Sequence, residues 1–369
     1  IINELLDTIK SRQTSPLTPI QICALISCYH PLHKVMADEK EFLSELSRSS
    51  EDFQRLTKIQ FFDPAEENEI KKNLKHFGTS ENEISKSVQS QYEENPYPRW
   101  ISLTNFPTPS DYLPLPDQER RNSRSILIAG CGTGLHALST AAIHPQAHVT
   151  AIDLSRSSLA YAQRKAHECG LADRVDFVHA DILNMTEWPS TFDIVESSGV
   201  LHHMQDPFKG WQVLNKLLKP GGYFKVGLYS EVARQQIVEA RTYVKDNGFP
   251  STTEGIRACR ESIFKLPSNH PMRKYLLASN DFYATSLIRD LIFHVQEHRM
   301  TLPQIKDMMD KLGLVCTSFA LTSPETALKY DKMFPDDPQR CNMLNWHTFE
   351  QKYPETFVGM YQFWCKKIA

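Results

Sequence analysis

The sequence predicts an α/β protein whose core is a mostly parallel sheet of seven strands. Two observations carry this prediction. Over residues 125–230, short apolar segments alternate with helical segments, and several of the short ones are apolar on both faces, as in a sheet covered on both sides. The first of them runs into the glycine-rich segment Gly130-Cys-Gly-Thr-Gly134, after which a helix is expected. With 369 residues, the chain is long enough for more than one module.

The strands are expected in two groups along the chain. The first group comprises 125–130, 148–153, 175–180, 192–197 and 223–229. The second group lies near the C-terminus and comprises 314–321 and 356–364. No crossover helix is evident between these last two strands, so one strand near the end is expected to run antiparallel.

The remaining segments surround this core. Residues 1–90 have apolar positions at helical spacing, followed by a charged stretch, and are expected to form a helical domain. Residues 91–124 are rich in proline and predict an irregular connector or lid. Residues 231–300 are expected to form a helical insertion after the fifth strand. Residues 301–369 then complete the core sheet.

Composition excludes several classes of protein. The net charge of −3 gives no general attraction to nucleic acid or to anionic membranes, and no basic stretch interleaved with aromatics favours a nucleic-acid partner. No apolar run approaches the roughly 20 residues needed to span a bilayer. The eight cysteines include no CxxC pair, and together with the lack of a signal peptide this predicts a reducing, cytoplasmic location. The chain does not begin with Met, so it is expected to be an excerpt or a processed product.

The glycine-rich segment predicts a nucleoside-containing ligand. Glycines at this spacing let the backbone turn tightly and approach a ligand without a Cβ clash. Asp153 ends the next strand, where its carboxylate is expected at an exposed tip that accepts hydrogen bonds from ribose hydroxyls. The third glycine comes one residue earlier than in Gly-x-Gly-x-x-Gly, which suits a ligand without a phosphate. Asp181 ends a further strand and is expected to bond an adenine amine.

These segments, with Phe192–Pro207 and the turn Leu217–Gly222, resemble in order and spacing the class I S-adenosylmethionine-dependent methyltransferases. The resemblance implies a Rossmann-like core that binds S-adenosylmethionine. It assigns the methionine part to Gly130, Gly132 and Gly134, the ribose to Asp153, the adenine to Asp181 and Ile182, and the pocket floor near the sulfonium to Ser197 and Ser198. Ile128 departs from the family, which often has an acid there.

The flanking segments resemble a narrower group. Gln91–Trp100, Ser286–Arg299 and Leu344–Glu350 are similar to the methyltransferase region of bacterial proteins that carry tetratricopeptide repeats upstream. This likeness implies an upstream repeat domain or partner, although the chain itself contains no such repeat.

Two residues near the expected cofactor mouth are candidates for the acceptor side. Methyl transfer from a sulfonium is an in-line displacement, and it needs a general base only if the acceptor arrives protonated. Tyr97 stands between two prolines before the first core strand and is expected to fold over the cofactor as part of a lid. The alternative is that it joins the helical domain to the sheet. His203 follows the fourth strand and is either a pocket residue or a loop histidine.

The segment His294-Val-Gln-Glu297-His298 matches the H-x-x-E-H pattern of the inverzincin proteases. On a helix, His294 and His298 would share one face with Asp290, as zinc ligands do. A metal is nevertheless not expected, because the chain already has a cofactor fold of another kind and spacing identifies no third ligand. The face is instead expected to line the acceptor site, where either histidine could take the acceptor's proton; a structural helix is the alternative.

The sequence therefore predicts methyl transfer from S-adenosylmethionine to a nitrogen or oxygen of a protein or small-molecule acceptor. One alternative is a non-catalytic scaffold with the same fold, which the competent residues at the cofactor positions disfavour. Another is an NAD(P)-dependent oxidoreductase. The early third glycine and the turn Lys219-Pro-Gly-Gly222 argue against it.

Overall fold

The computed structural model describes residues 2–11, 15–79, 82–94, 96–103, 124–321 and 323–368. The chain divides into two compact units, Ile1–Asn73 and Leu74–Ala369. Most of the predicted connector, residues 104–123, lies outside the described residues.

The first unit is helical. Its elements are α1 (Ile2–Ser11), α2 (Pro19–Ser27), α3 (Leu32–Val35), α4 (Lys40–Ser47), α5 (Glu51–Thr57), a π-helical segment (Lys58–Phe62) and α6 (Asp63–Lys72). Helix α2 begins with a capping box, in which Thr18 and Gln21 each bond the backbone N–H of the other. Ile22, Cys23 and Ile26 of this helix are buried in the core of the unit. Helix α7 (Glu83–Glu94), which begins in the helical domain predicted over 1–90 and ends in the predicted connector, belongs to the second unit.

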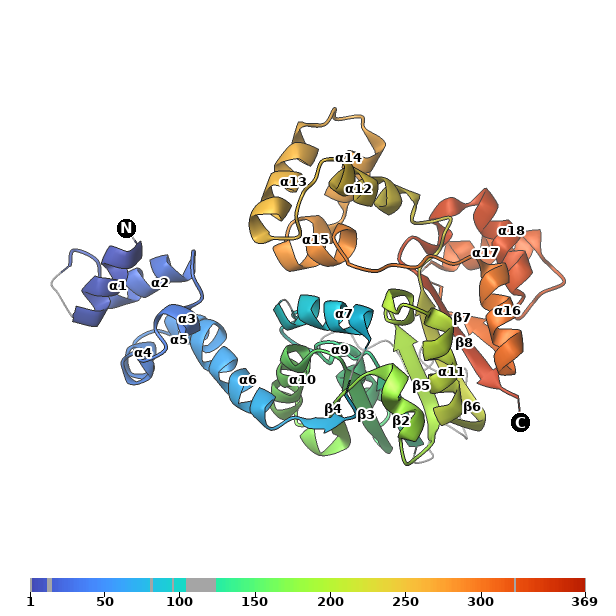
Figure 1. Ribbon diagram of the computed structural model, residues 1–369, viewed down its shortest axis with the longest axis horizontal. Helices are drawn as coiled ribbons and strands as arrows, with labels where there is room; N and C mark the ends of the chain where they lie inside the picture. Colours follow the sequence, from blue (N-terminus) through green and yellow to red (C-terminus); the bar gives the residue numbers. More distant parts are fainter. Residues whose placement is uncertain are drawn as a thin grey trace. The chain divides into compact units, whose positions relative to one another are not determined.

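The second unit is built on one sheet of eight strands, in the order β1-β4-β3-β2-β5-β6-β8-β7 (Figure 1). The strands are β1 (Lys75–Phe77), β2 (Arg124–Ala129), β3 (Ala147–Asp153), β4 (Val175–Ala180), β5 (Phe192–Ser198), β6 (Leu218–Leu228), β7 (Leu314–Phe319) and β8 (Tyr361–Lys367). All pairs are parallel except those of β8, which runs antiparallel to β6 and β7. The prediction of a mostly parallel sheet is confirmed.

The predicted number of seven strands and the last strand's bounds need correction. The additional strand β1 has three residues and pairs with β4 from Lys75↔Val178 to Phe77↔Ala180. A segment this short, with two exposed residues, carries no alternation that would mark it as a strand. The last strand begins at Tyr361 rather than near residue 356, because Pro354–Phe357 forms a 3₁₀ turn.

Helices cover the sheet on both faces. They are α9 (Leu135–Ile143), α10 (Arg156–Glu168), α11 (Pro207–Leu217), α16 (Leu302–Leu312), α17 (Pro324–Met333) and α18 (Met343–Lys352). Helices α9 and α10 pack against β3 and β4, whereas α11 packs against β5 and β6. The largest core cluster of the unit includes Trp211 of α11, Phe224 of β6 and Phe363 of β8, each no more than 1% exposed.

Four of the helices between β6 and β7, those that precede α16, form a group of their own. They are α12 (Gln235–Asp246), α13 (Thr253–Lys265), α14 (Pro271–Ala278) and α15 (Thr285–Ile292), the gold and orange helices labelled in Figure 1. They enclose a separate apolar core that includes Ile237, Ile256, Met272 and Ile288, all fully buried. This group therefore has packing of its own, distinct from that of the sheet.

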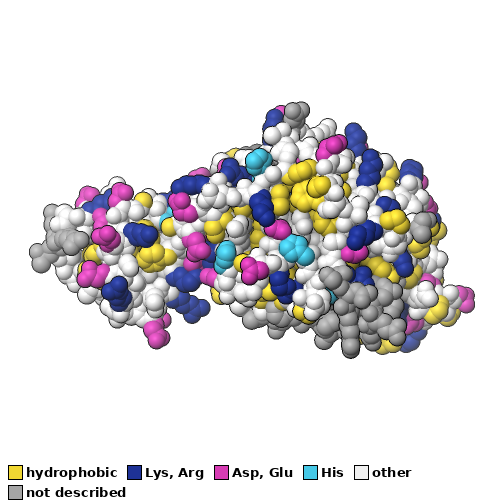
Figure 2. All heavy atoms as spheres, turned by 90° about the horizontal axis from the view of Figure 1, so that it is seen from below, with side chains coloured by type: hydrophobic (Ala, Val, Ile, Leu, Met, Phe, Trp, Pro, Cys, Tyr) yellow, Lys and Arg dark blue, Asp and Glu magenta, His cyan; other side chains and the backbone are white. Residues whose placement is uncertain are grey.

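Surface charge is mixed. In the view of Figure 2, side chains of Lys and Arg are interspersed with those of Asp and Glu over the visible described surface. Across the described parts of the chain, no helix is both long and apolar enough to span a membrane.

Candidate active site

A cavity of about 590 Å³ is lined from the carboxyl ends of the central strands. The strand order reverses direction between β2 and β5, and in open α/β sheets ligands bind at such a switch point. The wall residues at the end of β2 and the start of α9 are Gly130, Cys131, Gly132, Thr133, Leu135 and His136. From β3 and β4 come Asp153, Leu154, Asp181 and Ile182. The cavity is also lined by Tyr92, Tyr97, Ser198, His203, Tyr229 and Asp290.

The glycine loop has a backbone that only glycine adopts without strain. Gly130 and Gly134 have φ of +79° and +82°, in the left-handed region. A Cβ on Gly130 would lie 2.2 Å from a methyl carbon of Val200, and one on Gly134 would lie 2.5 Å from Cβ of Ala162. These glycines are therefore required by packing inside the protein as well as by any ligand at the loop.

Asp153 lies at the end of β3 and ties this loop to the strand. Its Oδ2 accepts a hydrogen bond from the backbone N–H of Gly132 at 2.8 Å, and its Oδ1 accepts one from Ser155 at 2.8 Å. Burial raises the pKa of the carboxyl, the Glu93 carboxylate adds to the rise, and the backbone donors oppose it. The expectation of an exposed strand tip is thus corrected, because the side chain is half-buried.

The two residues assigned to the adenine lie together after β4. Asp181 is 5% exposed and its Oδ1 accepts a hydrogen bond from Leu183 N at 3.0 Å, which caps the short turn Ile182–Glu187. Ile182 is also buried and lines the same part of the cavity, as do Ser85 and Val88 of α7.

The two serines at the end of β5 differ in their surroundings. Ser198 lines the cavity, and its Oγ is buried without a hydrogen-bond partner among the described residues. An orphaned hydroxyl in the wall of a cavity fits a polar ligand. Ser197 is buried but does not line the cavity, because successive side chains of a strand point to opposite faces.

Ile128 is buried in β2, and a buried carboxylate stands beside it on the neighbouring strand. Glu196 of β5 pairs with Ile128 in the sheet register and is 1% exposed. Its Oε2 lies 2.7 Å from His136 Nε2 and 3.7 Å from Lys225 Nζ, and both partners line the cavity. Burial alone would raise the pKa of Glu196, but these basic groups hold it below its ordinary value. Sequence reasoning missed Glu196, although an acid in an apolar strand was a visible signal.

A chain of hydrogen bonds includes Tyr92 and Asp290, which both line the cavity. The backbone N–H of Gln296 donates to His294 Nδ1 at 3.2 Å, so the neutral ring carries its proton on Nε2. That Nε2 lies 3.3 Å from the hydroxyl oxygen of Tyr92, and the Tyr92 hydroxyl donates to Asp290 Oδ1 at 2.5 Å. The chain therefore runs in one direction, from His294 through Tyr92 to Asp290.

His203 lines the cavity beside this chain. Its Nδ1 lies 2.7 Å from the carbonyl oxygen of Gln296, which can only accept, so Nδ1 carries the proton and Nε2 can accept one. The ring stacks on His294 with centroids 3.6 Å apart. Burial lowers the pKa of His203 to about 4 and that of His294 to about 2, which keeps both rings neutral at physiological pH.

The helix expected through the H-x-x-E-H segment is wrong. Helix α15 ends at Ile292, and the chain beyond it is irregular, so His294 and His298 share no helical face. Contacts with other segments override the helical pattern, because His298 N donates to His202 O at 2.7 Å and Met300 N donates to Tyr229 O at 2.9 Å. Neither His294 nor His298 lines the cavity. Within the described ranges, no cluster of three or more His, Cys, Asp or Glu side chains could hold a metal.

The Glu of this segment has a structural partner. Glu297 is 1% exposed in its side chain and forms two hydrogen bonds with the guanidinium of Arg234, at 3.1 and 2.8 Å. The same guanidinium lies 3.5 Å from the ring centroid of Tyr229, which lines the cavity. The guanidinium of Arg234 therefore stabilises the position of the Tyr229 ring through a cation–π contact.

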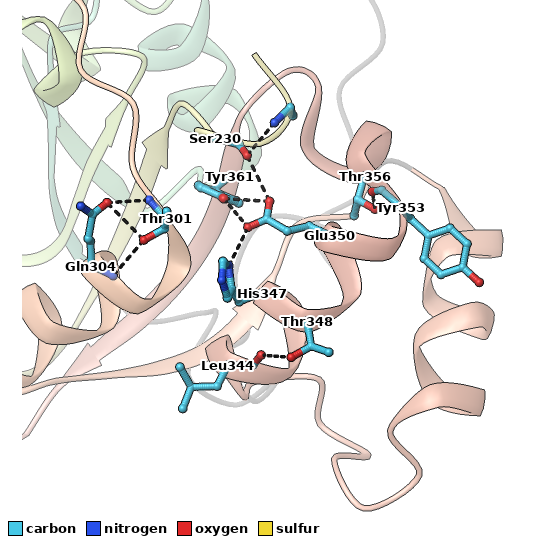
Figure 3. Close-up of polar contacts among 11 residues, drawn as sticks. Ser230, Thr301, Gln304, Leu344, His347, Thr348, Glu350, Tyr353, Thr356 and Tyr361 are labelled. Atoms are coloured by element: carbon cyan, nitrogen blue, oxygen red, sulfur yellow. Dashed lines mark hydrogen bonds and ion pairs between the residues drawn. The ribbon is translucent and has the colours of Figure 1, made fainter. Parts of the chain in front are cut away.

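A buried carboxylate fixes the turn that follows Tyr229. Glu350 of α18 accepts hydrogen bonds from Ser230 Oγ at 3.0 Å and from the Tyr361 hydroxyl at 2.7 and 2.8 Å, and His347 Nδ1 lies 3.3 Å away (Figure 3). Burial raises the pKa of Glu350, and these partners oppose the rise. This cluster links the segment that follows β6 to β8 and α18.

Comparisons with known proteins agree with this geometry. Residues 126–222 match the family model described as a methyltransferase domain. A protein of Synechococcus sp. is 32% identical over 203 residues, which is 53% of this chain and 48% of that protein. A ubiquinone biosynthesis O-methyltransferase of Aromatoleum aromaticum is 31% identical over 154 residues, 38% of this chain and 63% of that enzyme. The chain thus spans about half to two thirds of the length of these relatives.

Solved structures show the same fold. PKMT2 from Rickettsia typhi in complex with AdoHcy superposes with a TM-score of 0.53 at 16% identity, covering 73% of this chain and 54% of that one. At this identity the likeness concerns the fold. The prediction of the family and of its cofactor is confirmed. The chain carries an enzyme domain of the class I S-adenosylmethionine-dependent methyltransferases, and its cofactor is S-adenosylmethionine.

Proposed function

We propose that the protein transfers a methyl group from S-adenosylmethionine to a nitrogen or oxygen of a protein or small-molecule acceptor. One observation carries the proposal: a single cavity is lined both by the glycine loop and by polar side chains suited to an acceptor, among them Tyr97, His203 and Asp290. A donor and an acceptor bound in one cavity can meet in line, which is the main requirement of a displacement at a methyl carbon.

In this proposal the cofactor lies across the carboxyl ends of β2 to β5 and supplies an electrophilic methyl group on a sulfonium. The methionine part lies along Gly130, Gly132 and Gly134, the ribose meets Asp153, the adenine meets Asp181 and Ile182, and a polar group of the ligand meets Ser198. The orphaned Ser198 hydroxyl supports this placement.

Tyr97 is proposed to close the cavity over the cofactor. The segment that carries Tyr97 contacts the glycine loop. A Cβ added to Gly132 would lie 3.0 Å from the Tyr97 carbonyl oxygen, and Trp100 Nε1 donates a hydrogen bond to Thr133 O at 3.0 Å. Such a wall excludes water from a reactive sulfonium.

His203 is proposed as a proton acceptor for the incoming nucleophile, because it is neutral and its Nε2 can take a proton. His294 and His298 are proposed as positioning residues. His294 acts through its stacking on His203 and its contact with Tyr92, and His298 acts through its backbone bond to His202.

Calorimetric titration with S-adenosylmethionine, S-adenosylhomocysteine and NADH tests the cofactor half of the proposal. The two sulfur compounds should bind and NADH should not. Asp153→Asn should weaken both, since an amide cannot accept from two ribose hydroxyls and two backbone donors at once. Asp176→Asn is the matched control, because this residue of β4 pairs with Lys75 and His148 outside the cavity. Binding of NADH alone would contradict the proposal.

Turnover is tested by incubating the protein with a cell extract and S-adenosylmethionine labelled in the methyl group. Label should enter a macromolecular or a small-molecule fraction, and the variant Asp153→Asn should transfer much less. Cofactor binding without any transfer would favour a scaffold instead. An upstream repeat domain or partner and a cytoplasmic location stay predictions.

A further inference from the structure

The acceptor end of the cavity holds a carboxylate without a cationic partner. Asp290 of α15 lines the cavity, and Tyr92 is the hydrogen-bond donor to its Oδ1. Among the described residues, no Lys, Arg or His forms an ion pair with it. Arg234 is the cation whose charge acts on Asp290, and its guanidinium already donates two hydrogen bonds to Glu297. No cation among the described residues pairs directly with the negative charge of Asp290, so this charge attracts a positively charged ligand.

Three tyrosines surround the same space. Tyr92, Tyr97 and Tyr229 all line the cavity, and burial raises the pKa of each hydroxyl, so all three rings stay neutral. Neutral phenol rings present electron-rich faces and hydroxyl oxygens that attract a cation. None of the three could stabilise a negative charge as a positively charged side chain would.

The direction of the hydrogen-bond chain leaves the carboxylate open toward the cavity. His294 donates to the Tyr92 oxygen and Tyr92 donates to Asp290 Oδ1, so Tyr92 cannot turn its proton elsewhere without breaking a buried contact. Among the described residues, Asp290 Oδ2 has no hydrogen-bond donor. It is therefore available to a ligand N–H.

We propose that the acceptor is an amine that enters the cavity as an ammonium ion and is bound by Asp290 together with Tyr92, Tyr97 and Tyr229. The inference rests on the proposed function, because it names the acceptor class of the same site. An alcohol or phenol would have to lose a proton and become an anion beside Asp290, which like-charge repulsion disfavours.

In the transfer step, the ammonium bound by Asp290 gives one proton to His203 Nε2, the proton acceptor proposed above, and becomes a neutral amine. Its lone pair forms the new nitrogen–carbon bond while the carbon–sulfur bond breaks, and that electron pair stays on sulfur, which becomes the neutral thioether of S-adenosylhomocysteine. The product nitrogen carries the positive charge that the sulfonium carried before. It is again a cation beside Asp290, and His203 returns its proton to solvent.

The test uses the full chain and two analogues of S-adenosylhomocysteine in which nitrogen replaces sulfur and bears either an aminopropyl or a hydroxypropyl arm. Calorimetry at about pH 8, where the amine is protonated and Asp290 is ionised, gives both affinities. The aminopropyl analogue should bind at least about tenfold more tightly, as expected for a charge-assisted hydrogen bond. In Asp290→Asn this preference should disappear while the affinity for S-adenosylhomocysteine is unchanged.

The matched control is Asp281→Asn, which removes a carboxylate from the same insertion outside the cavity lining and should keep the preference. Tyr92→Phe provides a second variant and should reduce the preference, because Asp290 loses its one donor. Equal binding of the two arms, or a preference that survives in Asp290→Asn, would overturn the amine assignment and leave the methyltransferase proposal standing. Failure of S-adenosylhomocysteine itself to bind would overturn both.

Discussion

Replacing Asp290 with Asn should make the protein more stable at neutral pH, although it removes a charge from the proposed acceptor site. Burial raises the pKa of this carboxyl from its ordinary value of 3.8 to about 6, and Tyr92 and Arg234 only partly oppose the rise. At about 1.4 kcal/mol for each pKa unit, the ionised form costs the folded state about 3 kcal/mol. Asn keeps an oxygen that accepts the Tyr92 hydroxyl and carries no charge, so it should recover much of this free energy.

The stability gained in Asp290→Asn should depend on pH, because only the ionised form of Asp290 destabilises the folded protein. A carboxyl whose pKa is higher in the folded state favours folding when it is protonated. The advantage of Asp290→Asn should therefore be complete above about pH 7, shrink as the pH falls through about 6, and vanish below about pH 4. Asp281 and Glu297 raise the pKa of Asp290 as well, and both stay in place in the variant.

The assay is urea unfolding followed by tryptophan fluorescence. All five tryptophans lie in the unit Leu74–Ala369, so the signal reports on the unit that contains Asp290. The control is Asp310→Asn, which breaks an exposed pair with Lys306 and should change the unfolding free energy by less than about 1 kcal/mol. The reasoning fails if Asp290→Asn is no more stable than the wild type at neutral pH, or if its advantage is the same at all pH values.

Three further changes probe other parts of the site. Gly134→Ala should lower the free energy of unfolding clearly more than Gly170→Ala does. At Gly170 nothing lies within 4 Å of the new Cβ, so only the left-handed backbone costs about 1–2 kcal/mol. Equal losses in the two variants would contradict the packing argument. His203→Gln should lower kcat by about 10²-fold or more with unchanged affinity for S-adenosylhomocysteine, and a normal kcat would exclude a role as proton acceptor. Tyr361→Phe removes the one hydroxyl proton that Tyr361 donates to the buried Glu350 carboxylate and should cost about 1–3 kcal/mol in the same fluorescence assay. A neutral result would mean that Glu350 finds another donor.

The sequence could predict that the glycine loop, Asp153 and Asp181 meet in one cavity, because the signals are local. The glycine loop and Asp153 lie within one strand–helix–strand segment, and the backbone conformation of Gly130 and Gly134 requires the residue type itself. Asp181 is likewise fixed by its place at a strand end. The family and the cofactor follow from these residues, and both predictions are confirmed.

The acceptor half could not be predicted, because its contacts join distant segments. Tyr92 and Asp290 lie 198 positions apart, and no periodicity relates them. The same reason explains the wrong helix at His294: the pattern favoured a helix, but bonds to His202 and Tyr229 hold the chain in another conformation. Glu196 was missed because its basic partners lie on α9 and β6, outside its own strand.

The separate core of helices α12–α15 has a consequence for how this enzyme could change its acceptor. These helices pack around Ile237, Ile256, Met272 and Ile288, whereas the loops that line the cavity after β2, β3 and β4 follow strands that pack in the core of the sheet. Substitutions that reshape the four helices need not disturb those strands. The helical segment can therefore vary independently of the sheet, and it contributes Asp290 to the wall of the cavity. Chimeras that exchange residues 231–300 between relatives should keep cofactor affinity and differ in the acceptor they use.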